Sequence, residues 1–91
     1  MSDDGFEIVI VQAEAAKRGR VSIWNVYDRP RDYPTGFVAK MFELGRAGPQ
    51  PTPYALRSEE LEPIREKLSR AGLVYLPRDD ADEPQIIESW I

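Results

Sequence analysis

Two stretches in the middle of the chain, residues 21–28 and 37–44, are rich in β-branched and aromatic side chains, which are typical of strands. Successive side chains of a strand point to opposite faces of its sheet. In both stretches apolar residues fall on both faces: Val21, Ile23 and Tyr27 oppose Trp24 and Val26 in the first, while Phe37, Ala39 and Met41 oppose Val38, Phe42 and Leu44 in the second. The pattern therefore predicts a long-looped hairpin near the middle of a sheet.

The N-terminal part of the chain gives an ambiguous pattern. Residues 6–11 form a short β-branched apolar run that suggests a strand, but the following QAEAAKR favours a helix, so the segment could be either. Residues 1–5 are polar and are predicted to be a flexible N-terminus. Gly19 is expected to end whichever element precedes it.

Residues 45–57, GRAGPQPTPYALR, contain two glycines and three prolines, which argue against a regular helix and against a central strand. We expect an extended connector here. The proline-rich part lacks the PxxP spacing of a polyproline ligand and indicates a stiff linker.

A helix is predicted after Ser58, which could cap it, with Pro63 in its first turn and Gly72 as its stop. Its apolar face would be formed by Leu61, Ile64, Leu68 and Ala71. Residues 73–76 and 85–91 read as two further strands. The predicted element order is β, β, β, α, β, β. We therefore expect one α+β domain over residues 6–91, an antiparallel or mixed sheet of about four to five strands with one helix packed on one face.

Composition narrows the function classes. The chain has no cysteine and no histidine, which excludes disulfides and thiolate metal sites and removes the commonest general base. Carboxylate pairs such as Asp28 with Asp32, or Glu59 with Glu62, are present without a nucleophile motif or a phosphate-binding glycine loop. We predict no enzymatic activity, no cofactor and no bound metal. The chain lacks a secretory signal and an apolar window of membrane-spanning length, so it is predicted to be cytoplasmic and without membrane association.

Charge is unevenly distributed: acidic residues dominate both ends of the chain, and bases dominate residues 17–57. The bases of segment 17–46 could contact a nucleic acid, with Tyr27 or Tyr33 stacking on a base. These bases are Lys17, Arg18, Arg20, Arg29, Arg31, Lys40 and Arg46. The acidic sequence pI of about 4.8 argues against this use.

The loop YDRPRDYPTGF, residues 27–37, combines turn chemistry with two arginines. Arg29 precedes a proline and is expected to be extended, Gly36 could supply a positive φ, and Asp28 and Asp32 could cap the local backbone. The arginines are either paired with nearby acids or available to a partner. We take Arg29, Arg31 and Tyr33 as the candidate partner-binding residues.

Two other features have ordinary structural explanations. RDDADE, residues 78–83, has the D-x-D spacing that begins a calcium loop, but Pro84 and the missing glycine exclude an EF-hand and indicate a solvated turn. Trp24 and Trp90 could lie either in the core or at an interface.

The pattern SIWNVYDRPRDYPTGFVAK, with GLVYLPRD and IIESW further on, resembles a family of small bacterial proteins that have no established activity. The resemblance covers about residues 21–91. It implies an independent single domain and assigns no functional residue.

These observations favour a small non-enzymatic protein-interaction domain, of the kind that serves as an inhibitor or accessory factor encoded on a mobile element. Nucleic-acid contact through the basic segment 17–46 is the alternative. Because basic and acidic segments could face each other in two copies, a homo-oligomer is also compatible with the sequence.

Overall fold

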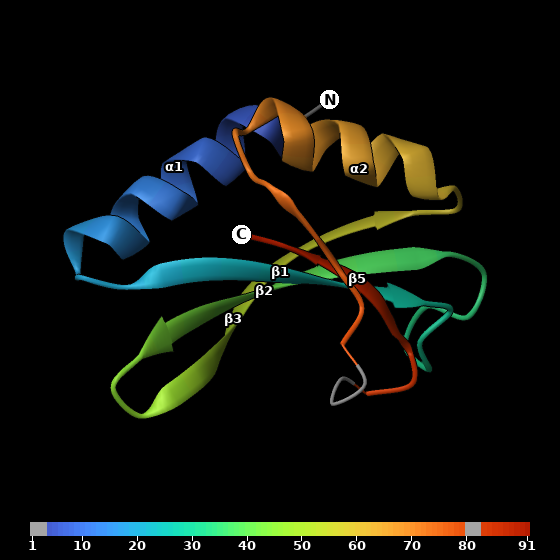
Figure 1. The fold of residues 1–91 in the computed structure, drawn as a ribbon. Coiled ribbons are helices and arrows are strands. Elements are labelled where there is room, and N and C mark those ends of the chain that lie inside the picture. The colour runs from blue at the N-terminus through green and yellow to red at the C-terminus, as the bar shows by residue number, and fades with distance from the viewer. Residues whose placement is uncertain (1–3, 80–82) are drawn as a thin grey trace.

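The structure is a computed structural model that describes residues 4–79 and 83–91. Its elements are α1 (Asp4–Lys17), β1 (Val21–Asp28), β2 (Phe37–Gly45), β3 (Gly48–Ser58), α2 (Leu61–Arg70), β4 (Tyr75–Pro77) and β5 (Ile86–Trp90). The strands form one antiparallel sheet in the order β3-β2-β1-β5-β4. Both helices cover the same face of this sheet (Figure 1). The α+β fold expected from the sequence is confirmed, with two helices in the described residues where one was predicted.

The segment 6–11 belongs to helix α1, so the strand interpretation was wrong and the helical alternative was right. Ile8 and Ala15, seven residues apart on one helical face, are fully buried against the sheet. Val9 and Ile10 remain exposed, which explains why the apolar run did not show a helical period. Residues 1–3 lie outside the described residues, whereas Asp4 and Gly5, predicted to be flexible, are already helical.

The predicted connector 45–57 is mostly strand β3, which pairs with β2 and forms an edge of the sheet. The prolines Pro49, Pro51 and Pro53 stand at alternate positions, so their missing N–H groups fall on one side of the strand. An edge strand tolerates proline where the N–H would point away from its neighbour. The hydroxyl of Thr52 donates a hydrogen bond to the carbonyl of Met41 at 2.9 Å, beside the irregular register of this pair.

The core lies between the helices and the sheet, on the face predicted for Trp24 and Val26. Trp24 pairs with Met41 on β2 and with Trp90 on β5, and all three side chains are buried. Both tryptophans are therefore core residues, which answers the question left open by the sequence.

Helix α2 follows the sequence prediction closely, with Ile64 and Leu68 buried and Pro63 in the first turn. The cap was assigned to the wrong residue: Glu60 is the N-cap, and Ser58 accepts a hydrogen bond from its N–H at 3.2 Å. Gly72 follows the helix with a φ of 88°, as a helix stop requires.

The loop between β1 and β2 differs from its prediction at two positions. Arg29 has a φ of 48° and is not extended, because its N–H closes the loop by donating to the carbonyl of Gly36 at 2.8 Å. Gly36 has no positive φ; it is needed for space, since a Cβ there would lie 2.5 Å from the carbonyl oxygen of Ser58.

Candidate functional site

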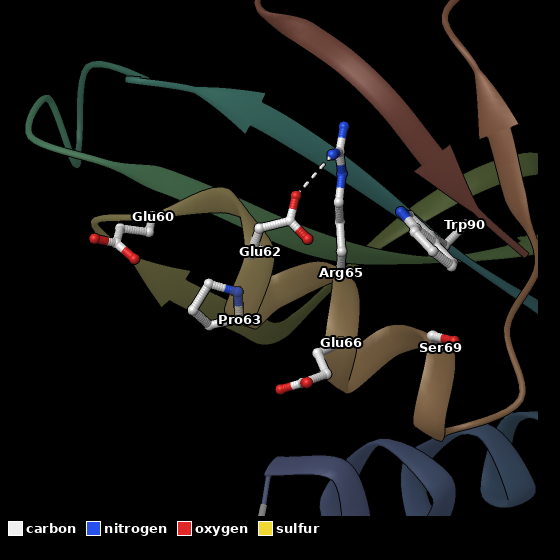
Figure 2. Close-up of a pocket in the computed structure, with 7 residues that line it drawn as sticks. All are labelled: Glu60, Glu62, Pro63, Arg65, Glu66, Ser69 and Trp90. Atoms are coloured by element: carbon white, nitrogen blue, oxygen red, sulfur yellow. Dashed lines mark hydrogen bonds and ion pairs between the residues drawn. The ribbon is translucent and has the colours of Figure 1, made fainter.

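A groove of about 430 Å³ lies beside α2, on the helix-covered side of the sheet (Figure 2). We call it the α2 groove. It is lined by Glu60, Glu62, Pro63, Arg65, Glu66, Ser69 and Trp90. Figure 2 shows Arg65 extending from α2 toward the strands, with Trp90 across from it. Three of the lining side chains are carboxylates and one is a base, so the groove has an acidic lining.

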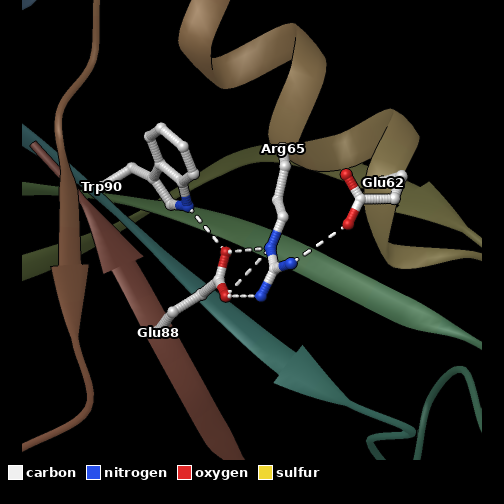
Figure 3. A network of polar contacts seen from close by, with 4 residues as sticks. All are labelled: Glu62, Arg65, Glu88 and Trp90. Atoms are coloured by element: carbon white, nitrogen blue, oxygen red, sulfur yellow. Dashed lines mark hydrogen bonds and ion pairs between the residues drawn. The ribbon is translucent and has the colours of Figure 1, made fainter.

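The single base of the groove is already used within the fold (Figure 3). Nη2 of Arg65 donates to Oε1 of Glu88 at 2.6 Å, and its Nε lies within 3.2 Å of both Glu88 oxygens. The indole N–H of Trp90 donates to Oε2 of Glu88 at 2.9 Å, and Nη1 of Arg65 donates to Glu62 at 3.1 Å. The groove therefore presents more negative than positive charge to a ligand.

The network exists because β5 places Glu88 on the core side of the sheet, where only 1% of the residue is exposed. A buried carboxylate is costly unless it is paired and hydrogen-bonded. Arg65 and Trp90 supply these partners and thereby fix α2 against β5. The hydrogen bond to Glu88, followed by the charge of Glu88 and then by Glu62, raises the pKa of Arg65 above its ordinary value, so this side chain stays charged.

Beside the groove, strand β4 forms the second edge of the sheet and exposes apolar side chains. Val74 is 62% exposed, Tyr75 47% and Leu76 37%, and the neighbouring Ile91 is 40% exposed. Tyr75 packs edge-on against Trp90 with ring centroids 5.7 Å apart, which links the strand to the groove. We call these four residues the β4 edge.

The backbone of the β4 edge has unused hydrogen-bonding groups. Val74 and Ile91 exchange two hydrogen bonds between N–H and carbonyl groups, of 2.8 and 2.9 Å. Both backbone groups of Val74 therefore point inward, toward the C-terminal strand of the sheet. Because backbone groups alternate along an antiparallel pair, those of Tyr75 point outward. The outer edge of β3 instead carries its three prolines. β4 therefore offers the outward N–H of Tyr75 beside a run of exposed apolar side chains, and Pro77, two residues further on, ends its outward donors.

The predicted site residues Arg29, Arg31 and Tyr33 lie together in the loop after β1. Nη1 of Arg29 pairs with Asp28 at 3.1 Å, which is the intramolecular alternative considered from the sequence. Tyr33 is half-buried, and Arg31 is exposed without a side-chain partner in residues 4–79 and 83–91. Asp32 pairs with Lys40 at 3.7 Å. A partner-binding role for this loop stays a prediction that depends chiefly on Arg31.

The structure separates the basic residues that the sequence grouped. Arg18 and Arg20 lie before the start of β1, whereas Arg29 and Arg31 follow its last residue, Asp28. The turn that carries Arg46 lies at the same end of the sheet as Arg18 and Arg20, because Leu44 pairs with Val21 at the start of β1. Segment 17–46 therefore does not form one continuous basic surface.

Sequence reasoning did not identify Arg65, Glu88 or the exposed β4 edge. One signal was present: the strand IIESW carries a glutamate two residues before a core tryptophan, which is unusual for a buried position. Its partner on α2 lies 23 residues earlier, and no local pattern connects the two.

No group of His, Cys, Asp and Glu suited to a metal occurs in the described part of the chain. Asp80 and Asp82 of the RDDADE segment lie outside it. None of the helices described here is long and apolar enough to cross a membrane. Comparison with protein-family models, with curated proteins and with solved structures found no match to this chain. The family resemblance of its sequence thus stays a prediction.

Proposed function

We propose that this protein is a non-enzymatic interaction domain that binds an extended segment of another protein along the β4 edge and the α2 groove. The observation that carries this proposal is the contrast between the two edges of the sheet. Three prolines remove donors from the first half of β3, whereas β4 presents the outward backbone groups of Tyr75 beside exposed apolar side chains. A partner strand that adds to a sheet edge uses such groups for affinity.

The acidic lining of the α2 groove favours a partner segment with basic side chains. Its lining has three carboxylates and one base: Arg65 pairs with Glu88 and Glu62, and Glu66 pairs with Arg70, which leaves Glu60 without an ion-pair partner among the described residues. Complementary charge raises association rates and selects among partners. The ligand that fits is an extended segment in which basic and apolar side chains alternate, with the basic set on the face of the groove and the apolar set on the opposite face, beside Val74 and Leu76.

Alternating peptides test the charge requirement. An extended peptide of alternating lysine and valine should bind, as measured by fluorescence anisotropy of a labelled peptide. A peptide of alternating glutamate and valine should bind at least about tenfold more weakly, a difference of ~1.4 kcal/mol. Equal binding of the two peptides would remove the support that the groove gives to the proposal.

A pair of variants tests the backbone requirement. Tyr75→Ala removes the ring, while Tyr75→Pro removes the ring and also the outward N–H, leaving the hydrogen bonds to β5 in place. We expect Tyr75→Pro to bind the lysine–valine peptide more weakly than Tyr75→Ala. If the two variants bind alike, the peptide does not extend the sheet at β4.

The loop with Arg29, Arg31 and Tyr33 offers a separate contact surface for the same class of partner. Arg31 is its available charge, since Arg29 pairs with Asp28. Capture of partners from a lysate by the native protein and by an Arg31→Glu variant distinguishes this surface from β4. Loss of a partner in Arg31→Glu, but not in Tyr75→Pro, would assign that partner to the loop.

A further inference from the structure

At the end of the sheet where β1 begins, three arginines from two separate segments meet around a hollow of about 320 Å³. Arg18 and Arg20 lie between α1 and β1, and Arg46 lies in the turn between β2 and β3. Gly19 and Gly45 complete the lining. We propose that Arg18, Arg20 and Arg46 form a binding site for a phosphate group. This site is independent of the β4 edge and of the function proposed for it.

The charge of the hollow exceeds what the fold itself requires. Glu43 on β2 is 7% exposed and accepts hydrogen bonds from Arg18 and, at 3.4 Å, from Nη1 of Arg20. One arginine would neutralise this carboxylate, yet two pair with it and a third lies beside them. Arg46 has no ion-pair partner among the described residues. The hollow therefore keeps two uncompensated positive charges.

Glu43 also holds the arginines in position for a ligand. The side chains of Arg18 and Arg20 are 50% and 44% exposed, so part of each guanidinium remains accessible beside the contact with Glu43. A guanidinium has five N–H donors, of which a carboxylate occupies only some. Side chains fixed in this way lose less conformational entropy when an anion binds.

Both glycines of the lining border open space. A Cβ added at Gly19 would meet no atom within 4 Å, and one at Gly45 would lie 3.6 Å from Nε of Arg20. The C-terminal carbonyls of α1, which would repel an anion, are used within the turn: Ala15 accepts from the N–H groups of Arg18 and Arg20, and Ala16 from that of Gly19.

The lining identifies the chemistry of the ligand. Arginine matches phosphate oxygens with paired N–H groups. No aromatic side chain lines this hollow in the described structure, so stacking on a nucleobase contributes nothing here. The site therefore recognises phosphate itself, carried by a small phosphorylated molecule or by a nucleic-acid backbone.

Pyrophosphate is the direct probe, titrated into the full chain and followed by calorimetry at low salt. Arg46→Gln should weaken its binding about tenfold, the change expected from ~1.4 kcal/mol of charge-assisted hydrogen bonding. Since the Arg46 side chain pairs with no other side chain among the described residues, the variant should have the same unfolding temperature as the native protein. Arg57→Gln is the matched control. Arg57 is exposed on β3 near the opposite end of the sheet, where it lies opposite Val38 of β2, so this variant should bind pyrophosphate as tightly as the native protein.

A second titration with a single-stranded oligonucleotide distinguishes the two sources of phosphate. Oligonucleotide binding that is tighter than pyrophosphate binding and lost in Arg46→Gln would assign the site to a nucleic-acid backbone. If pyrophosphate binds and the oligonucleotide binds no more tightly than pyrophosphate, the site would be assigned to small phosphorylated molecules. Absence of pyrophosphate binding, or equal weakening by Arg46→Gln and Arg57→Gln, would overturn the proposal.

Discussion

Replacing Arg65 by methionine tests whether the pair with Glu88 fixes α2 and the wall of its groove. Methionine preserves much of the side-chain length but leaves the Glu88 carboxylate without its cation. The carboxylate keeps one hydrogen bond, the 2.9 Å contact from the Trp90 indole. We expect Arg65→Met to lower the free energy of unfolding substantially.

The magnitude follows from the burial of the two partners. Removing one member of a buried ion pair costs about 3–5 kcal/mol, because the other charge remains desolvated. The Glu88 side chain is 2% exposed, which places the pair in this class, but Arg65 is 37% exposed and water can replace part of it. The lower end, about 3 kcal/mol, is therefore expected. Glu88→Gln keeps the shape but replaces one accepting oxygen by an NH2 group that would face the donors of Arg65 or Trp90, so it should also be destabilising, by about 1–3 kcal/mol.

Urea unfolding, followed by tryptophan fluorescence and analysed by linear extrapolation, measures these changes. Arg70→Met is the matched control on the same helix. Arg70 pairs with Glu66 at 3.8 Å, and both side chains are at least two-thirds exposed (74% and 67%), so its loss should cost less than about 0.5 kcal/mol. If Arg65→Met costs no more than Arg70→Met, the Glu88 pair does not hold α2, and the reasoning is refuted.

Three further predictions concern stability and association. Because hydrogen bonding to Glu88 raises the pKa of Arg65, the pair contributes fully below the ordinary arginine pKa and is lost only as pH rises through the raised value. The stability difference between native protein and Arg65→Met should therefore stay constant from about pH 7 to about pH 10, and a decline in that range would contradict this. Gly36→Ala should cost about 1–3 kcal/mol of unfolding free energy through overpacking. Gly45→Ala, whose Cβ would find its nearest atom at 3.6 Å, should cost clearly less in the same unfolding assay. Replacing Pro49, Pro51 and Pro53 together by threonine should open the β3 edge and raise self-association in sedimentation velocity; a sedimentation coefficient equal to that of the native protein would show that the prolines do not protect this edge.

The central hairpin could be predicted because its alternation is local. Trp24 and Val26 face the helices and Tyr27 faces the opposite side, as the sequence pattern requires. The amphipathic pattern of α2 was equally clear, since Ile64 and Leu68 are the residues that it buries.

The missed elements follow from side chains whose environment is set by distant parts of the chain. Val9 and Ile10 are apolar but exposed, so α1 lacked a clear helical period. The prolines of β3 are compatible with a strand only at a sheet edge, and edge position depends on the strand order, which the local sequence does not encode.

The candidate sites depend even more strongly on tertiary structure. The network of Arg65 with Glu88 joins a helix to a strand, and Arg46 meets Arg18 only because β1 and β2 pair in one register. Sequence reasoning assembled the basic residues into one segment, while the sheet places them at two ends. It also directed attention to the loop of Arg29 and Arg31, whereas the groove and the β4 edge became visible only in the fold.

The most direct test of the proposed function is the location of the bound lysine–valine peptide, measured as backbone amide shift changes in an NMR titration. The account predicts the largest changes at Val74, Tyr75 and Leu76 of the β4 edge and at residues 62–69 along α2. Changes confined to residues 29–36, or changes along β3, would contradict binding at the β4 edge.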